Sequence, residues 1–318
     1  MNICKKGDSI MKLFDFHCDT PFALEKHGEP LTDNNRHISL KKVESYDSYG
    51  QLMAIFTQKS LPEEVAWGRF FVIREDFYAK MTEKTALCHT FADYEKAISE
   101  GKHPFFIAVE GGGLLCDKLE RLTTLYEHDV RFLTLVWRDA DCIGGAFNTD
   151  VGLTDFGREV VKKCFEMGIV IDLSHASDPM AEEVLTMAEA AGKAVIATHS
   201  DSRAVYAHPR NLPDDFAKRI ARLGGTVGIS MAPQHLGAND YADIDTICDH
   251  MLHYLEIGLE DSLTFGCDFD GLDTLPEGVE DISKIIDIAD ALRKKGVSEE
   301  QIEKIFYKNA ERFLKENF

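Results

Sequence analysis

Short apolar segments recur eight times along this 318-residue chain, and most of them precede a stretch with helical character. The segments are rich in β-branched and aromatic residues, and several are almost continuously apolar, such as FFIAV, GIVIDL and AVIAT. Such continuity is typical of parallel strands that are buried on both faces. The predicted strands span residues 13–17, 51–57, 104–109, 131–136, 169–173, 194–198, 226–230 and 262–267.

Helical patterns lie between these strands, at residues 155–167, 179–191, 213–223 and 243–257. Eight predicted strands, most of them followed by a helical stretch, predict an α/β fold, a (β/α)8 barrel of the TIM type. No linker rich in proline, glycine or serine divides the chain, so we expect a single domain. Residues 1–11 are expected to form a flexible extension, and residues 12–318 the barrel with a closing C-terminal helix that begins after Ser298.

The overall charge argues against polyanionic partners. With 35 basic and 55 acidic side chains, the formal net charge of -20 repels nucleic acid and anionic membrane surfaces. The N-terminal residues contain two lysines but no apolar stretch of signal-peptide length, so we expect a cytoplasmic protein without a membrane partner. The eight cysteines are scattered singly, which favours reduced thiols over disulfides or a cysteine-based metal site.

Polar side chains stand at the C-terminal ends of the predicted strands, where barrel enzymes build their active sites. His17 and Asp19 follow the first strand two positions apart, so in extended backbone both point into the barrel mouth. Glu110 follows the third strand and precedes three glycines that allow close approach of a ligand. His175 and His199 follow the fifth and sixth strands. Each residue alone also fits an ordinary hydrogen-bonded side chain, but their shared position predicts a metal site.

These five residues provide three ligands to each of two metals if Glu110 is shared, and leave positions open for water. Mixed imidazole and carboxylate ligands suit two Zn²⁺ ions, with Mn²⁺, Co²⁺ or Fe²⁺ as alternatives. The eighth strand ends in FGCDFDG, where Asp268 is placed to accept a proton from metal-bound water. Asp270 is expected to turn the loop instead.

A long loop after the sixth strand, DSRAVYAHPRNLPDD, carries Arg203, His208 and Arg210 beside the expected metals. An arginine at this place can bind a substrate carboxylate through two parallel hydrogen bonds. The alternative is an arginine that pairs with Asp214 or Asp215 in the same loop.

Several of these segments resemble the motifs of the membrane (renal) dipeptidase family, binuclear zinc peptidases among the amidohydrolase-like barrels. The resemblance spans nearly the whole chain and rests on HCDTP, VEGG, DLSHAS, THSDSRAVYAHPRNLPDD, GCDFDG and NAERF. It implies that His17, Asp19 and Glu110 bind one zinc ion and that Glu110, His175 and His199 bind the other. It also implies that Arg210 binds the terminal carboxylate of the substrate and that Asp268 handles protons.

The sequence departs from the family at the fourth strand, in LTLVWRD. Mammalian members have a histidine that contacts substrate where this chain has Trp137. Bacterial relatives often have tryptophan followed by asparagine, and here Arg138 replaces that asparagine. Trp137 and Arg138 are therefore candidate substrate-binding residues that set how the substrate is oriented.

Together these inferences predict a metal-dependent dipeptidase in which a bridging hydroxide on a binuclear zinc centre attacks the peptide bond. Glu110 and Asp268 are the expected catalytic residues, and dipeptides, including L-D dipeptides, are the expected substrates. The family also implies a homodimer. One alternative is hydrolysis of a lactone, a β-lactam or a phosphoester on the same metal pair, and another is a non-catalytic binding protein with the same fold.

Overall fold

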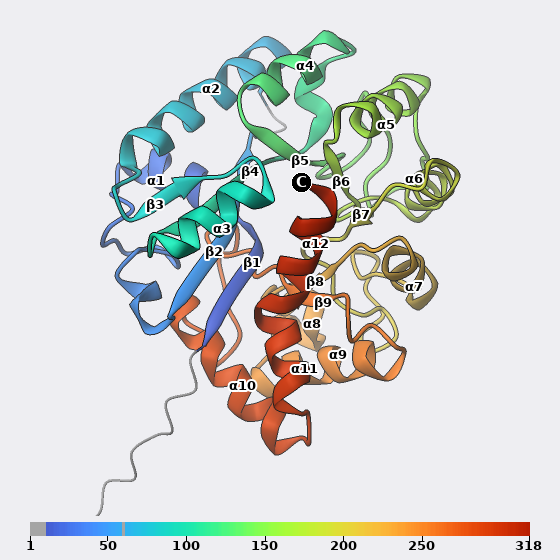
Figure 1. Ribbon diagram of the computed structural model, residues 1–318. Coiled ribbons are helices and arrows are strands. Elements are labelled where there is room, and N and C mark those ends of the chain that lie inside the picture. Colours follow the sequence, from blue (N-terminus) through green and yellow to red (C-terminus); the bar gives the residue numbers. More distant parts are fainter. Residues whose placement is uncertain (1–10, 59–60) are drawn as a thin grey trace, which may run out of the picture.

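A computed structural model of the protein describes residues 11–58 and 61–318. Eight parallel strands follow one another in the order β7-β6-β5-β4-β2-β1-β9-β8, and a bridge between Ala197 and Val227 closes the ring (Figure 1). This arrangement confirms the predicted (β/α)8 barrel, and each predicted strand overlaps one of the eight. They are β1 (Lys12–Cys18), β2 (Ser48–Phe56), β4 (His103–Glu110), β5 (Val130–Thr134), β6 (Val170–Asp172), β7 (Val195–Ile196), β8 (Val227–Ile229) and β9 (Leu263–Phe265).

Helices surround the barrel, as Figure 1 shows. The four predicted helices correspond to α5, α6, α7 and α9. The helices are α1 (Thr20–His27), α2 (Glu63–Lys80), α3 (Phe91–Ser99), α4 (Glu120–Glu127), α5 (Asp155–Met167), α6 (Asp178–Ala191), α7 (Asp214–Arg222), α8 (Pro233–Leu236), α9 (Ile244–Glu256), α10 (Ile285–Lys294), α11 (Glu299–Glu303) and α12 (Asn309–Asn317). None of the described helices is long and apolar enough to cross a lipid bilayer.

Aromatic side chains fill the N-terminal half of the barrel. Phe16 and Phe132 lie in this cluster, and their rings are 5.9 and 6.4 Å from Phe313 of α12. Helix α12, red in Figure 1, thus lies across the N-terminal end of the barrel and leaves the other end for the site. The segment that leads to it begins at Ser298, whose side chain caps α11 together with Gln301.

Three smaller features complete the fold. A short strand that the sequence did not reveal, β3 (Thr85–Leu87), pairs with the first residues of β4. Residues 1–10 of the expected N-terminal extension lie outside the described residues, and Met11 is buried in the core. The seven cysteines in the described part of the chain are free thiols, as expected.

Two local features of the backbone position the site. Strand β1 has one extra residue between Asp15 and Cys18 relative to β2, a β-bulge that changes the direction of nearby side chains. At the closure of the barrel, a Cβ atom on Gly266 would lie 1.6 Å from the carbonyl oxygen of Thr198. Only glycine allows this close approach, which holds the end of β7 against the end of β9.

Candidate metal centre

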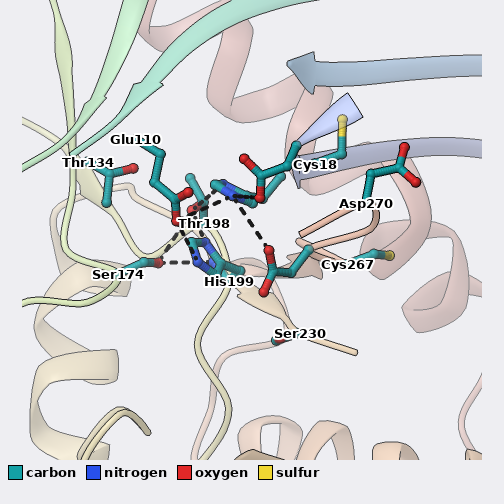
Figure 2. Close-up of polar contacts among 12 residues, drawn as sticks. Cys18, Glu110, Thr134, Ser174, Thr198, His199, Ser230, Cys267 and Asp270 are labelled. Atoms are coloured by element: carbon teal, nitrogen blue, oxygen red, sulfur yellow. Dashed lines mark hydrogen bonds and ion pairs between the residues drawn. The ribbon is translucent and has the colours of Figure 1, made fainter. Parts of the chain in front are cut away.

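The carboxylate of Glu110 lies at the centre of three imidazoles from three different strand ends. Its Oε1 atom is 3.7 Å from Nε2 of His17, 3.0 Å from Nε2 of His175 and 3.6 Å from Nε2 of His199. The Nε2 atoms of His175 and His199 are themselves 2.9 Å apart. Figure 2 shows Glu110 and His199 pointing toward one another. One carboxylate oxygen thus faces all three predicted histidine ligands.

A second group of ligand atoms surrounds His17. Its Nε2 atom lies 3.9 Å from Oδ2 of Asp19 and 3.8 Å from Oδ1 of Asp268. The backbone N–H of Asp268 donates to the carbonyl of His17, and Asp15 accepts from the N–H groups of His17 and Cys267. The ends of β1 and β9 therefore hold these side chains together. Asp268, predicted to handle protons, lies as close to His17 as the predicted ligand Asp19 does.

Asp19 reaches the site by a different route from the one predicted. The expected extended backbone after β1 is absent at Asp19, which has φ -96° and ψ 19° and precedes α1. The bulge in β1 and this turn together bring His17 and Asp19 to the same point, whereas Phe16 packs inside the barrel. The pair meets as expected, but the strand alternation assumed for it is wrong.

The donor atoms fit divalent metal ions. Nε2 of His17 and Oδ1 of Asp19 are buried and have no hydrogen-bond partner among the described residues. Burial lowers the pKa of His17 to about 4 and those of His175 and His199 well below the usual value, so the imidazoles are neutral. Neutral imidazoles with free Nε2 atoms are the form that binds metals.

The acidic residues of the site repel one another, and the charge of Arg210 offsets this effect only in part. Burial raises the pKa of Glu110 and Asp19 well above the usual range, and the neighbouring carboxylates raise both pKa values further. Burial also raises the pKa of Asp268 to about 7. A Cβ atom on Gly271 would lie 2.2 Å from Oδ2 of Asp19 and 2.7 Å from Oδ1 of Asp268, so only glycine leaves room for these carboxylates. Cations between them would remove their repulsion.

Thr198 determines which nitrogen of His199 carries the proton. The Thr198 hydroxyl lies 2.7 Å from Oδ2 of Asp172 and 2.7 Å from Nδ1 of His199. Because it donates its hydrogen to the carboxylate, it accepts one from Nδ1 of His199. Nε2 of His199 is then left with a free lone pair that points toward Glu110.

Asp172 is a supporting residue that sequence reasoning missed. Although it lies near His17 and His199, its carboxylate is already saturated. Its Oδ1 accepts from the backbone N–H groups of Ser174 and Thr198, and its Oδ2 accepts from the hydroxyls of Thr134 and Thr198. We therefore infer that Asp172 orients the predicted ligands through these hydrogen bonds and does not itself bind a metal. An aspartate inside the apolar strand GIVIDL was the available signal, since a buried acid needs partners.

The backbone is unusual at two of the site residues. His175 has φ 70° and Asp268 has φ 62°, in the left-handed region that residues other than glycine rarely adopt. Such conformations concentrate at functional sites, where the surrounding structure holds them in place. Asp270 has φ 68° as well, but its carboxylate accepts from the Thr20 hydroxyl and the His37 N–H. Figure 2 shows Asp270 turned away from Glu110.

Trp137 and Arg138, the two residues that depart from the family pattern after the predicted fourth strand, differ in the pockets that they line. Trp137 lines a pocket of about 180 Å³ together with Glu110, His175 and Asp268. The ring of Trp137 is 4.9 Å from that of Phe56, and both rings line this pocket. Arg138 is exposed and lines a neighbouring pocket of about 240 Å³, which Trp137 also borders. The structure thus brings Trp137, but not Arg138, to the pocket that the predicted ligands Asp19, Glu110 and His175 line.

Arg210 is buried beside the predicted metal ligand His199. Its guanidinium donates to the Ser200 hydroxyl and to the carbonyl of His199, and burial lowers its pKa while nearby acids such as Asp268 oppose that effect. The alternative pairing with Asp214 or Asp215 is absent among the described contacts of Arg210.

The other arginine of this loop lies elsewhere. Arg203 pairs with Asp178 at the start of α6, and Asp214 pairs with His253. Arg210, and not Arg203, is therefore the arginine of this loop that lies beside the predicted ligand His199.

Three solved structures with similar folds are a dipeptidase, a metallopeptidase and a probable dipeptidase. The dipeptidase AC, a metallopeptidase of family M19, has a TM-score of 0.89 at 23% identity, over 97% of this chain and 99% of that one. A metallopeptidase from Rhodobacter sphaeroides, bound to a phosphinate mimic of L-Ala-D-Ala, gives 0.89 at 22% identity, over 98% and 100%. The probable dipeptidase PvdM from Pseudomonas aeruginosa gives 0.86 at 17% identity, over 96% and 95%.

These sequence identities are too low to show more than a shared fold. Membership of a family rests instead on the match between this sequence and the family as a whole. Residues 7–317 match the family described as membrane dipeptidase, peptidase family M19. The match covers almost the whole chain, including every strand end that contributes a side chain to the centre. With the motifs, the barrel and the converging side chains in agreement, this chain belongs to the membrane dipeptidase family, peptidase family M19.

Proposed function

We propose that this metal-dependent dipeptidase hydrolyses dipeptides, including L-D dipeptides, at a centre of two zinc ions. The observation that carries the proposal is the position of Glu110, whose Oε1 atom faces the Nε2 atoms of three histidines. A single carboxylate shared in this way is what two adjacent metal sites require. The acids near His17 supply further oxygen ligands on one side of it.

In this proposal His17, Asp19 and Glu110 hold one metal, and Glu110, His175 and His199 hold the other. When bound, the zinc ions would polarise the scissile carbonyl and lower the pKa of a water molecule. Thr198 and Asp172 keep Nε2 of His199 available as a ligand, through the hydrogen bond at Nδ1.

Asp268 is the proposed proton carrier. Its carboxylate lies within the group of ligand atoms, and burial raises its pKa to about 7, close to the value that suits proton exchange at neutral pH. Oδ1 of Asp268 would accept a proton from the attacking water and pass it to the nitrogen of the leaving amine. Hydrolysis then yields one carboxylate and one amine without a further reactant.

Arg210 and Trp137 define the two sides of the proposed substrate site. Arg210 is a buried cation whose remaining N–H groups can bind the terminal carboxylate. Trp137 and Phe56 form an aromatic wall on the side of the pocket, which has a volume of about 180 Å³ and suits a small substrate. The bound mimic of L-Ala-D-Ala in the Rhodobacter relative supports an L-D dipeptide as substrate.

A panel of L-L, L-D and D-D dipeptides, assayed with and without added zinc, tests the proposal. We expect zinc-dependent release of free amino acids, with L-D dipeptides among the substrates. The Arg210→Ala variant should lose most of its turnover through a higher KM. Unchanged turnover of dipeptides by this variant would mean that the carboxylate is not bound there, and activity on lactones or phosphoesters instead would point to the alternative class of substrate.

Two further expectations stay proposals. A cytoplasmic location can be tested by cell fractionation, and a homodimer by light scattering on the purified protein. A monomer at micromolar concentration would contradict the homodimer.

A further inference from the structure

Two histidines outside the proposed metal ligands meet beside Arg210. His208 lies in the loop after β7, His235 lies in α8, and their ring centroids are 4.8 Å apart. The ring of Phe147 is 6.3 Å from His208 and 6.1 Å from His175. Ring contacts therefore connect the proposed metal ligand His175 to His208 and His235 through Phe147. The two histidines lie at the same end of the barrel as the proposed metal site.

Contacts with Arg210 determine the hydrogen-bonding state of His208. Its Nδ1 atom accepts from the backbone N–H of Arg210 at 3.1 Å. Burial lowers the pKa of His208, and the charge of Arg210 lowers it further, so the ring is neutral. A neutral imidazole that accepts at Nδ1 carries its hydrogen on Nε2. His208 is therefore a hydrogen-bond donor whose position is fixed by the residue beside it.

A dedicated network holds His235 next to this loop. The side-chain amide of Asn211 donates to the carbonyl of His235 at 2.7 Å. The buried His250 accepts from the N–H of Ser202 at Nδ1 and donates from Nε2 to the carbonyl of Leu236. Helix α8 is thus tied to the Arg210 loop by two side chains.

The His235 ring itself has no hydrogen-bond partner among the described residues, although burial and the charge of Arg210 lower its pKa to about 2 and keep it neutral. The network therefore holds in place a ring whose own polar atoms remain available.

The guanidinium of Arg210 also has unused hydrogen-bonding capacity. Its Nη1 and Nη2 atoms donate to Ser200 and to the backbone of His199, and its buried Nε atom has no partner in the described part of the chain. Acids such as Asp268 act on Arg210, but none of the described residues forms an ion pair with it, so its free N–H groups can bind an anion that arrives with the substrate. His208 contacts the backbone of Arg210, His235 packs on His208, and as neutral rings they add no positive charge to compete for that anion.

We propose that His208 and His235 complete, with Arg210, the binding site for the terminal carboxylate of the dipeptide, with His235 as a specificity-determining residue. This inference rests on the proposed dipeptidase function. A carboxylate offers about four lone pairs, more than one guanidinium edge can satisfy, so neutral N–H groups at its side strengthen and orient its binding. A substrate that lacks the carboxylate gains nothing from them.

The test compares two variants of His235 on two ligands. His235→Phe keeps the aromatic ring that packs on His208 and removes both nitrogen atoms, whereas His235→Asn restores a donor. L-Ala-D-Ala and its C-terminal amide are measured with each zinc-loaded protein, the amide as substrate or as competitive inhibitor. His103→Phe is the matched control, because His103 is a partly buried histidine at the start of β4, at the opposite end of the barrel.

We expect His235→Phe to raise KM for L-Ala-D-Ala by about tenfold or more, as for a lost hydrogen bond to a charged group, with little change in kcat. His235→Asn should recover part of this loss, and the amide should bind equally to all variants. An equal loss for the amide, or a fall in kcat with unchanged KM, would overturn the proposal while the dipeptidase function stands. Failure of the wild-type protein to hydrolyse any dipeptide would overturn both.

Discussion

Replacement of Thr198 by valine removes a single hydroxyl that contacts the proposed metal ligand His199. Valine has nearly the same shape, so the packing inside the barrel is preserved. The hydroxyl lies 2.7 Å from both Asp172 and His199, and 3.3 Å from the hydroxyl of Ser174. In the Thr198→Val variant Nδ1 of His199 loses its acceptor, so the proton is no longer held on that nitrogen.

Two effects of known size follow. Loss of an outer partner of a metal-binding histidine typically lowers metal affinity about 10- to 100-fold, which equals about 1.4 to 2.7 kcal/mol. A buried donor left without an acceptor costs about 1–3 kcal/mol in the metal-free protein. Titration of the apoprotein with Zn²⁺ against a competing chelator measures the first effect, and thermal unfolding without metal measures the second. We expect both to be clearly above the error of the assays.

Thr264 provides a matched control for this experiment. It is also a fully buried threonine of the barrel, but its hydroxyl has no hydrogen-bond partner among the described residues. Thr264→Val should therefore be neutral or stabilising and should bind zinc as the wild type does. Wild-type zinc affinity in Thr198→Val, or equal losses in both variants, would refute the assignment of Thr198 to His199.

Three further changes test other parts of the site. Asp268→Asn should lower kcat by 100-fold or more, on the order of a lost acid-base group, and activity assays that retain near wild-type kcat would exclude Asp268 as proton carrier. Gly271→Ala places a methyl group 2.2 Å from Asp19, so metal content measured by mass spectrometry should fall; full occupancy would contradict the packing. Zinc affinity should weaken as the pH falls from about 8 to 6, because burial raises the pKa of Asp268 to about 7 and its protonation removes a negative charge beside the proposed metal sites. Calorimetry that shows no pH dependence would contradict this.

The barrel could be predicted because its strands are buried on both faces and so need apolar runs. Helix α5 occurs at the predicted residues 155–167. Helix α2 was missed although Ala66, Phe70, Ile73 and Phe77 are buried at helical spacing, since its aromatic and β-branched residues also fit a strand. Strand β3 was missed because it has only three residues. It forms by pairing with the first residues of β4, a contact between segments that a sequence pattern does not reveal.

That the five proposed metal ligands lie close together could be predicted because all of them follow apolar strands, whose ends meet at one rim in a barrel. The exact backbone conformations that position these side chains could not be predicted. The bulge in β1 and the left-handed backbone at His175 and Asp268 arise from tertiary packing and have no sequence signature. Likewise, His235 joins the Arg210 loop only through hydrogen bonds between segments that are distant in the sequence.

Zinc titration of the chelator-treated protein, followed by L-Ala-D-Ala hydrolysis and by metal analysis on the same samples, tests the binuclear dipeptidase proposal most directly. Because Glu110 faces three histidines and two further carboxylates lie at His17, we expect activity to rise with bound zinc up to about two ions per chain. Full activity of the chelated protein, or maximal activity below about one ion per chain, would contradict the binuclear site.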